Sequence, residues 1–227
     1  HLLAFKRETV AAVEQFHGTL SGEPWVGGSS IPGEYLLPPK LGEFNKKYPL
    51  VKPILRIGDS AGIVADLLDG KVEIAYVGFK DADARLVFEK IWNDEMVVAV
   101  PKGHPWSRRK GIEVADLRNE KFISREHGSG TLDSLRQLLA KRKQPTHELL
   151  NITMELGSTE AVKEALMAGY GFSILSRISI RHELKEGSIV EVPIRGLKLE
   201  RGFYQVFHSR RPFHPIAQAF RGFLKRP

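Results

Sequence analysis

The chain contains no cysteine among its 227 residues. This absence excludes disulfide bonds, thiolate metal sites and cysteine nucleophiles together. It fits a cytoplasmic protein, although exported binding domains also often lack cysteine. No apolar run approaches the roughly 20 residues that span a bilayer. The first residues lack both a Met and the basic-then-apolar pattern of a signal peptide. We therefore expect the chain to begin inside a longer, cytoplasmic protein.

The motifs of common catalytic sites are also missing. The segment Gly27–Ile31 lacks the second glycine of a G-x-S-x-G elbow, and Gly128–Thr131 lacks the lysine of a phosphate loop. The 8 histidines are dispersed, and no two have the i, i+4 spacing of a zinc helix. His127 lies near Ser129, but no carboxylate is evident to orient it. The sequence thus predicts no enzyme, no catalytic residue, no metal site and no cofactor.

Composition bounds the class of protein. With 42% hydrophobic and 27% charged residues the chain is typical of a globular protein. Its length suits one domain of moderate size or two small ones. The 34 basic and 27 acidic residues give a net charge of +7, which suits nucleic acid, an anionic ligand or solubility. The basic clusters are not interleaved with aromatic residues, so we interpret them as solvated surface.

One stretch, Trp25–Pro38, has the pattern of a strand that runs into a helix. Two apolar residues precede a glycine pair and two serines. Ser30 is a natural N-cap, Pro32 suits the first helical turn, and Glu34 suits the positive end of the helix dipole. The pattern predicts backbone N–H groups at a helix N-terminus that point toward an anion.

The same plan recurs in three further segments. In Ile54–Val77 an apolar strand meets Gly58-Asp59-Ser60, and a helix ending at Gly70 follows. Asn151–Ser176 repeats this with a helix opened by Gly157-Ser158-Thr159, and Phe122–Thr131 leads into a helix at 132–143. Ligands of open α/β sheets bind outside the carboxyl ends of the strands. Four such ends therefore predict one crevice lined by helix N-termini.

These segments carry a family resemblance. S-S-I-P-G-E-Y-L-L-P, L-x-x-F-x-x-x-Y-P (Leu41–Pro49), V-V-A-V-P-x-x-H-P (Val97–Pro105), R-E-x-G-S-G-T (Arg125–Thr131) and A-G-Y-G-F-S-I-L-S follow one another in order. Together they resemble the effector-binding domain of LysR-type transcriptional regulators, over nearly the whole chain. The resemblance implies an α/β fold of two Rossmann-like subdomains joined by two crossover segments, similar to type 2 periplasmic binding proteins.

The resemblance also implies an organisation of the chain. Residues 1–23 would end a linker helix, residues 24–100 and 203–227 would form subdomain I, and residues 101–202 would form subdomain II. We expect separate strands at 84–91 and 96–100, the second buried in a parallel sheet, and a bend or break at Pro38-Pro39. The final helix should pack on subdomain I through Ile216, Phe220, Phe223 and Leu224.

The implied function is a ligand-sensing domain that binds a small anionic effector in the cleft between the subdomains. It would assemble as a homodimer or tetramer and control a DNA-binding head outside this chain. The alternative is an extracytoplasmic solute-binding protein of a transporter, which would share the fold and the cleft. The chain itself should contact neither membrane nor specific DNA sequence, because no helix-turn-helix pattern is present.

The resemblance places ligand contacts at Ser29 to Ile31, at Ser129 to Thr131 and near Ser60. Arg125 adds a planar guanidinium that matches carboxylate or sulfate oxygens. Each residue also has a purely structural explanation: Ser30 and Ser158 would cap helices, Ser60 would lie in a turn, and Arg125 would pair with Glu126 or another surface acid. The predicted ligand-binding residues are Ser29, Ser30, Ile31, Ser60, Arg125, Ser129, Gly130 and Thr131.

Overall fold

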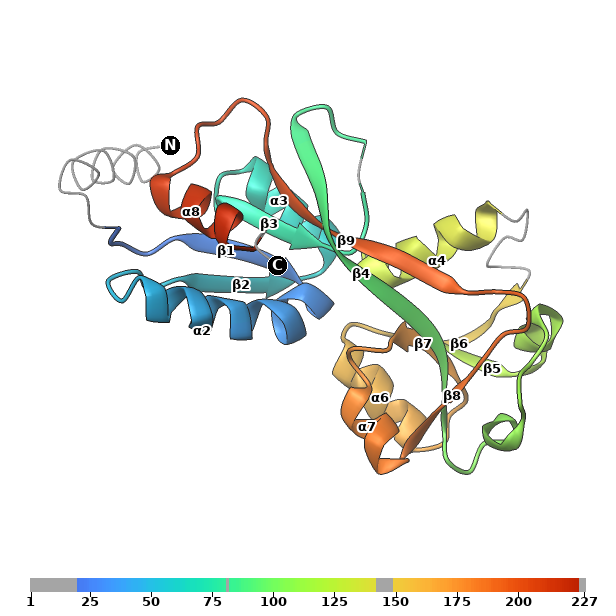
Figure 1. The fold of residues 1–227 in the computed structure, drawn as a ribbon. Coiled ribbons are helices and arrows are strands. Elements are labelled where there is room, and N and C mark those ends of the chain that lie inside the picture. The colour runs from blue at the N-terminus through green and yellow to red at the C-terminus, as the bar shows by residue number, and fades with distance from the viewer. Residues whose placement is uncertain (1–19, 81, 142–148, 225–227) are drawn as a thin grey trace. The chain divides into compact units, whose positions relative to one another are not determined.

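The computed structural model describes residues 20–80, 82–141 and 149–224 (Figure 1). They form two compact units: unit 1 ends at Trp92 and resumes at Phe203, and unit 2 comprises Asn93–Gly202. The chain passes from one unit to the other in two long strands, β4 (Leu86–Pro101) and β9 (Leu199–His208). The linker helix predicted at the N-terminus falls in residues 1–19, outside the described ranges.

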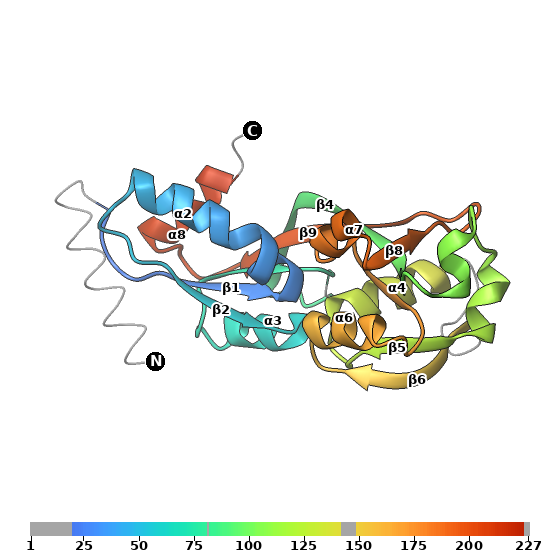
Figure 2. The ribbon, with the colours of Figure 1, turned by 90° about the horizontal axis from the view of Figure 1, so that it is seen from below.

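Unit 1 is a sheet covered by helices on both faces, as Figure 2 shows. Its strands have the order β2-β1-β3-β9; β1 is parallel to β2 and β3, and β9 is antiparallel to β3. Helices α2 and α8 lie on one face and α3 on the other. The elements are β1 (Trp25–Ser29), η1 (Pro32–Leu36), α2 (Leu37–Lys47), β2 (Ile54–Gly58), α3 (Ser60–Leu68), β3 (Ile74–Val77) and α8 (Pro215–Leu224).

Strand alternation explains the two cores of unit 1. Ile74 and Tyr76 of β3 face α2 and α8, whereas Ala75 and Val77 face α3. On the first face Phe44 of α2 makes edge-to-face contacts with Phe220 and Phe223 of α8, at centroid distances of 5.0 and 5.5 Å. The packing of the final helix on this unit, predicted from its apolar side, is confirmed.

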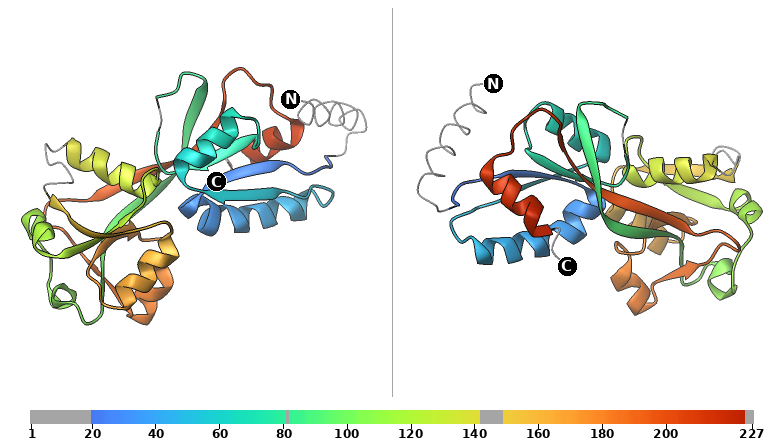
Figure 3. Two further views of the ribbon diagram at one scale, coloured as in Figure 1. Left: turned by 180° about the vertical axis from the view of Figure 1, so that it is seen from behind. Right: turned by 45° about the horizontal axis from the view of Figure 1, so that its top comes forward.

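Unit 2 also has helices on both sides of its strands (Figure 3). β4 pairs antiparallel with β7 and with β8, and β5 is parallel to β6. Helix α4 packs in one core and α6 and α7 in the other. The elements are η2 (Pro105–Arg108), η3 (Val114–Asn119), β5 (Lys121–Arg125), α4 (Gly130–Ala140), β6 (Asn151–Leu156), α6 (Thr159–Met167), β7 (Ser173–Ser176), α7 (Arg181–Glu186) and β8 (Ile189–Val192).

The structure corrects two expectations about β4. The two strands predicted at 84–91 and 96–100 are one continuous strand of 16 residues. Its apolar run is not in a parallel sheet, because both β7 and β8 run antiparallel to it. An apolar run indicates burial on both faces but carries no information on strand direction. The division between the two units lies within β4, between Trp92 and Asn93.

The proline pair is accommodated rather than disruptive. Pro38 and Pro39 lie in the first turn of α2, where missing N–H groups are tolerated. The turn before them, η1, is π-helical, and the N–H of Leu37 donates to the carbonyl of Pro32. The predicted bend therefore takes the form of a wider helical turn that precedes α2.

Candidate functional site

The carboxyl end of β1 leads directly into the π-helical turn η1. Ser29 closes the strand, and both Ser29 and Ile31 are buried. The capping role predicted for Ser30 is wrong: the residue at the cap position of η1 is Ile31, which has helical dihedral angles and no side-chain cap. The chain already turns helically at Ser30, so that residue lacks the extended backbone typical of an N-cap.

A fully buried serine hydroxyl begins helix α3. The cap of this helix is Asp59, whose Oδ1 accepts from the N–H of Gly62 at 2.7 Å. Ser60 follows it with 0% of its surface exposed. Within the described ranges, its Oγ has no hydrogen-bond partner. A buried polar atom that the protein does not satisfy requires an explanation, and a bound ligand or water supplies one.

Helix α4 of unit 2 begins at the second predicted set of ligand contacts. Ser129 stands at its N-cap position with an extended backbone, but its side chain makes no capping hydrogen bond. Gly130 and Thr131 form the start of the first turn, and Ser129 and Thr131 are buried. The first N–H groups of a helix have no intrahelical partner. This turn therefore presents backbone donors that no cap from Ser129 satisfies.

Arg125, also predicted to bind ligand, is engaged inside the protein. Its Nε and Nη2 donate to the two carboxylate oxygens of Glu126, both at 2.7 Å. Its Nη1 donates to Oγ1 of Thr159 at 2.7 Å. The guanidinium thus has the bidentate carboxylate pairing that the sequence offered as its structural explanation. Arg125 ties β5 to the start of α6.

Sequence reasoning missed a buried arginine behind the first turn of α4. Arg201 of β9 donates through Nη1 to the carbonyl of Gly130 at 3.1 Å and to Oγ1 of Thr131 at 3.2 Å. Its Nε donates to Oδ2 of Asp94 in β4 at 2.7 Å. Burial lowers the pKa of Arg201 and nearby Arg125 lowers it further, while Asp94 opposes both effects. No local sequence motif predicts the pairing of Arg201 with Asp94, because the two residues lie far apart in the sequence.

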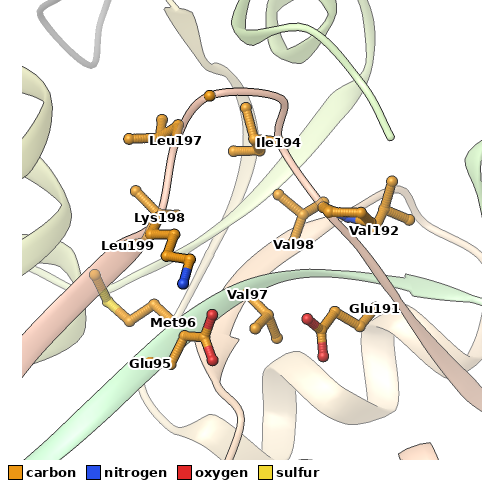
Figure 4. A pocket seen from close by; sticks show the side chains of 12 residues that line it. Glu95, Met96, Val97, Val98, Glu191, Val192, Ile194, Leu197, Lys198 and Leu199 are labelled. Atoms are coloured by element: carbon orange, nitrogen blue, oxygen red, sulfur yellow. The ribbon is translucent and has the colours of Figure 1, made fainter. Parts of the chain in front are cut away.

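Unit 2 contains a pocket of about 590 Å³ beside β4 (Figure 4). The carboxylates of Glu95 and Glu191 lie at one side of it, and both pair with Arg177. Nη1 of Arg177 lies 2.9 Å from Oε2 of Glu95, and its Nε lies 3.0 Å from Oε2 of Glu191. None of the residues predicted to bind ligand lines this pocket. Its apolar lining includes Met96, Val98, Val192, Ile194, Leu197 and Leu199.

Two features are absent from the described ranges. No group of three or more acidic or histidine side chains there is arranged to hold a metal ion. In the same ranges, no helix has the length and apolar character that crossing a membrane requires.

Comparison with known proteins identifies regulators. The chain is 33% identical over 192 residues to the RuBisCO operon transcriptional regulator of Acidithiobacillus ferrooxidans, covering 84% of this chain and 60% of that protein. It is 29% identical over 222 residues to a probable RuBisCO transcriptional regulator of Trichormus variabilis, covering 96% and 66%. The chain thus spans less than two thirds of the length of these two relatives.

A solved structure extends the likeness to three dimensions. The regulatory domain of CcmR from Synechocystis PCC6803, in complex with 2-PG, is similar with a TM-score of 0.81 and 25% identity. The match covers 90% of this chain and 96% of that one. The fold expected from the sequence, two α/β subdomains similar to type 2 periplasmic binding proteins, is confirmed. Residues 17–226 match the LysR substrate binding domain, and the chain belongs to this family.

Proposed function

We propose that this chain is the ligand-sensing domain of a LysR-type transcriptional regulator, and that its effector is a small anion. The effector would contact the start of η1 and Ser60 in unit 1, and Ser129 to Thr131 in unit 2. Sequence-specific DNA binding would belong to a head outside this chain. The regulator names of the relatives support this function over that of a transporter's solute-binding protein.

One observation carries the proposal: serines at two helix starts are buried but do not cap their helices. Asp59 caps α3 in place of Ser60, and Ser129 makes no side-chain cap at α4. Ser158 provides the contrast, since its Oγ accepts from the N–H of Ala161 at 3.1 Å and caps α6. Hydroxyls that the fold does not use remain available to a ligand.

The available atoms favour a ligand rich in hydrogen-bond acceptors. The first turn of α4 offers backbone N–H groups at the positive end of a helix dipole, where negative charge is stabilised. Serine hydroxyls donate as well as accept. An oxyanion such as a carboxylate, phosphate or sulfate can use all of these donors. The 2-PG complex of the similar CcmR domain adds 2-PG to the compounds worth testing.

Isothermal titration of the chain with 2-PG, phosphate, sulfate and simple carboxylates tests the proposal. We expect at least one anion to bind, and Ser60→Ala and Ser129→Ala each to weaken that binding by about 0.5–1.5 kcal/mol, the net worth of one hydrogen bond. The matched control is Ser158→Ala, which removes a helix cap and lowers stability by about 1 kcal/mol without changing affinity.

Several results would contradict parts of the proposal. Binding of neutral compounds alone would exclude an anionic effector. Equal losses of affinity in Ser158→Ala and Ser129→Ala would show that the serines act only through stability. A loss confined to the variant in one unit would show that the ligand contacts one set of residues and not the other.

The location of DNA specificity needs a separate test. Fluorescence anisotropy compares the binding of this chain to the regulator's promoter and to a scrambled copy. A tenfold preference of this chain for the promoter would contradict the proposal that DNA specificity belongs to a head outside it.

A further inference from the structure

A buried ion pair fixes the start of α4 to the two strands that connect the units. The side chains of Arg201 and Asp94 are 4% and 0% exposed, and the Nε–Oδ2 distance is 2.7 Å. The other oxygen of Asp94 accepts from Oγ of Ser176 at 2.7 Å. Both carboxylate oxygens therefore have partners, as a buried charge requires. The guanidinium is held in one orientation against β4.

A second nitrogen of this guanidinium contacts the predicted ligand turn. Nη1 of Arg201 donates to the Gly130 carbonyl and to Oγ1 of Thr131. An arginine can only donate hydrogen bonds. In its bond with Arg201 the Thr131 oxygen must therefore accept, and the hydroxyl hydrogen has to point elsewhere. In the described part of the chain, that hydrogen meets no acceptor.

We propose that Arg201, oriented by Asp94, is a positioning residue of the effector site that presents the Thr131 hydroxyl to the ligand as a donor. This inference rests on the proposed function. The backbone N–H groups of the first turn of α4 and the Thr131 hydroxyl are then all donors toward the ligand. The effector group bound there should be one that only accepts, meaning a fully deprotonated carboxylate, sulfonate or phosphate. A group that carries its own O–H would place that donor opposite a donor of the protein, and no hydrogen bond would form between the two.

A purely structural role for the pair predicts something different. In that case the pair would stabilise the packing of β4, β7 and β9, and its removal would lower stability and weaken all anions alike. The two roles separate in the preference between sulfate and phosphate at pH 5. The two ions have similar size and shape, but sulfate carries acceptors alone, whereas phosphate at this pH carries O–H donors.

The experiment measures the dissociation constants of sulfate and phosphate at pH 5 by isothermal titration, on the whole chain. We expect the wild type to prefer sulfate. Thr131→Val, which keeps the shape and removes the hydroxyl, should reduce that preference by about three- to tenfold, the range that one hydrogen bond contributes. Thr131→Ser keeps a hydroxyl and should retain the preference. The control Ser158→Ala should leave both dissociation constants unchanged.

The double variant Asp94→Asn/Arg201→Gln tests the arginine itself. Removing both charges avoids an unpaired buried ion, which would destabilise the fold strongly. We expect this variant to lose the sulfate preference as Thr131→Val does. A folded double variant with the wild-type preference would overturn the inference, and so would an unchanged preference in Thr131→Val, whether or not the double variant folds. A wild type that binds neither ion overturns the anionic function itself, together with this inference.

Discussion

The backbones of Gly28 in β1 and Gly33 in η1 approach each other closely near the predicted site. A Cβ atom added to Gly28 would lie 2.6 Å from Cα of Gly33 and 2.9 Å from Cδ1 of Leu37. Both distances are shorter than any normal carbon–carbon contact. The Leu37 methyl group can rotate, but the Gly33 Cα is backbone and cannot. Gly28→Ala must therefore push the strand and the helical turn apart.

The expected cost follows from overpacking in a filled interior. Such insertions destabilise by about 1–3 kcal/mol. In a chain of this length each 1 kcal/mol lowers the melting temperature by about 2–4 °C, so we expect a decrease of roughly 2–12 °C. Ser29, Ser30 and Ile31, together with Pro32, connect the two glycines along the chain. Gly28→Ala should therefore also weaken the binding of any anion that the wild type binds.

A second glycine in the same unit supplies a matched control. Gly42 lies in α2, and a Cβ added there meets no other described atom within 4 Å. Gly42→Ala should stabilise the chain by about 0.5–1 kcal/mol, because alanine favours the helix more than glycine does. Urea unfolding followed by circular dichroism measures both variants. If Gly28→Ala is as stable as the wild type, the strand and the turn are not in tight contact and the reasoning is wrong.

Two further predictions concern pH and assembly. Burial lowers the pKa of His104, with Glu120 opposing and Arg109 adding to the decrease, and its Nδ1 accepts from the N–H of Trp106. The folded pKa lies below the unfolded value of about 6.5, so the unfolded chain binds more protons and stability falls as pH drops below that value. Between pH 7.5 and 5 the free energy of unfolding of the wild type should fall by about 0.5–1.5 kcal/mol more than that of His104→Asn, because an asparagine side chain accepts a hydrogen bond but does not titrate. Equal losses in urea unfolding would contradict this. For assembly, we expect self-association through α2 and α6, as the family resemblance implies. Met167 of α6 is exposed, so Met167→Glu should lower the dimer fraction in sedimentation velocity, and a wild type that stays monomeric at high micromolar concentration would contradict it.

Local sequence patterns predicted the local structures well. The apolar runs that end in small residues are strands that lead into helices, at β1, β2, β5 and β6. Gly70 follows the helix that it was expected to stop, with φ of +73°, and Gly169 follows α6 with φ of +83°. These features depend on side chains a few residues apart, because the left-handed backbone that ends a helix favours glycine wherever the chain requires it.

Contacts between distant segments were not predictable in the same way. An apolar run has the same pattern beside a parallel or an antiparallel neighbour, so the pairing of β4 was predicted incorrectly. Arg201 stands in the segment L-E-R-G-F, where a solvated arginine is the ordinary interpretation. Its burial depends on Asp94, on the other connecting strand, and on the start of α4. Only the three-dimensional fold brings these groups together.

The serines at the helix starts show how much of a site can be deduced from sequence. Ser60 follows an aspartate, and the carboxylate takes the capping position, so the serine hydroxyl is released from that task. Ser158 follows a glycine, and here the serine itself must cap the helix. Ser129 also follows a glycine but makes no cap, and the difference at α4 is that Arg201 holds the first turn from behind. Arg201 cannot replace a cap, because a guanidinium only donates and an N-cap must accept from the N–H groups. It contacts the Gly130 carbonyl and the Thr131 hydroxyl, and it leaves the N–H groups of that turn to the anion that we propose.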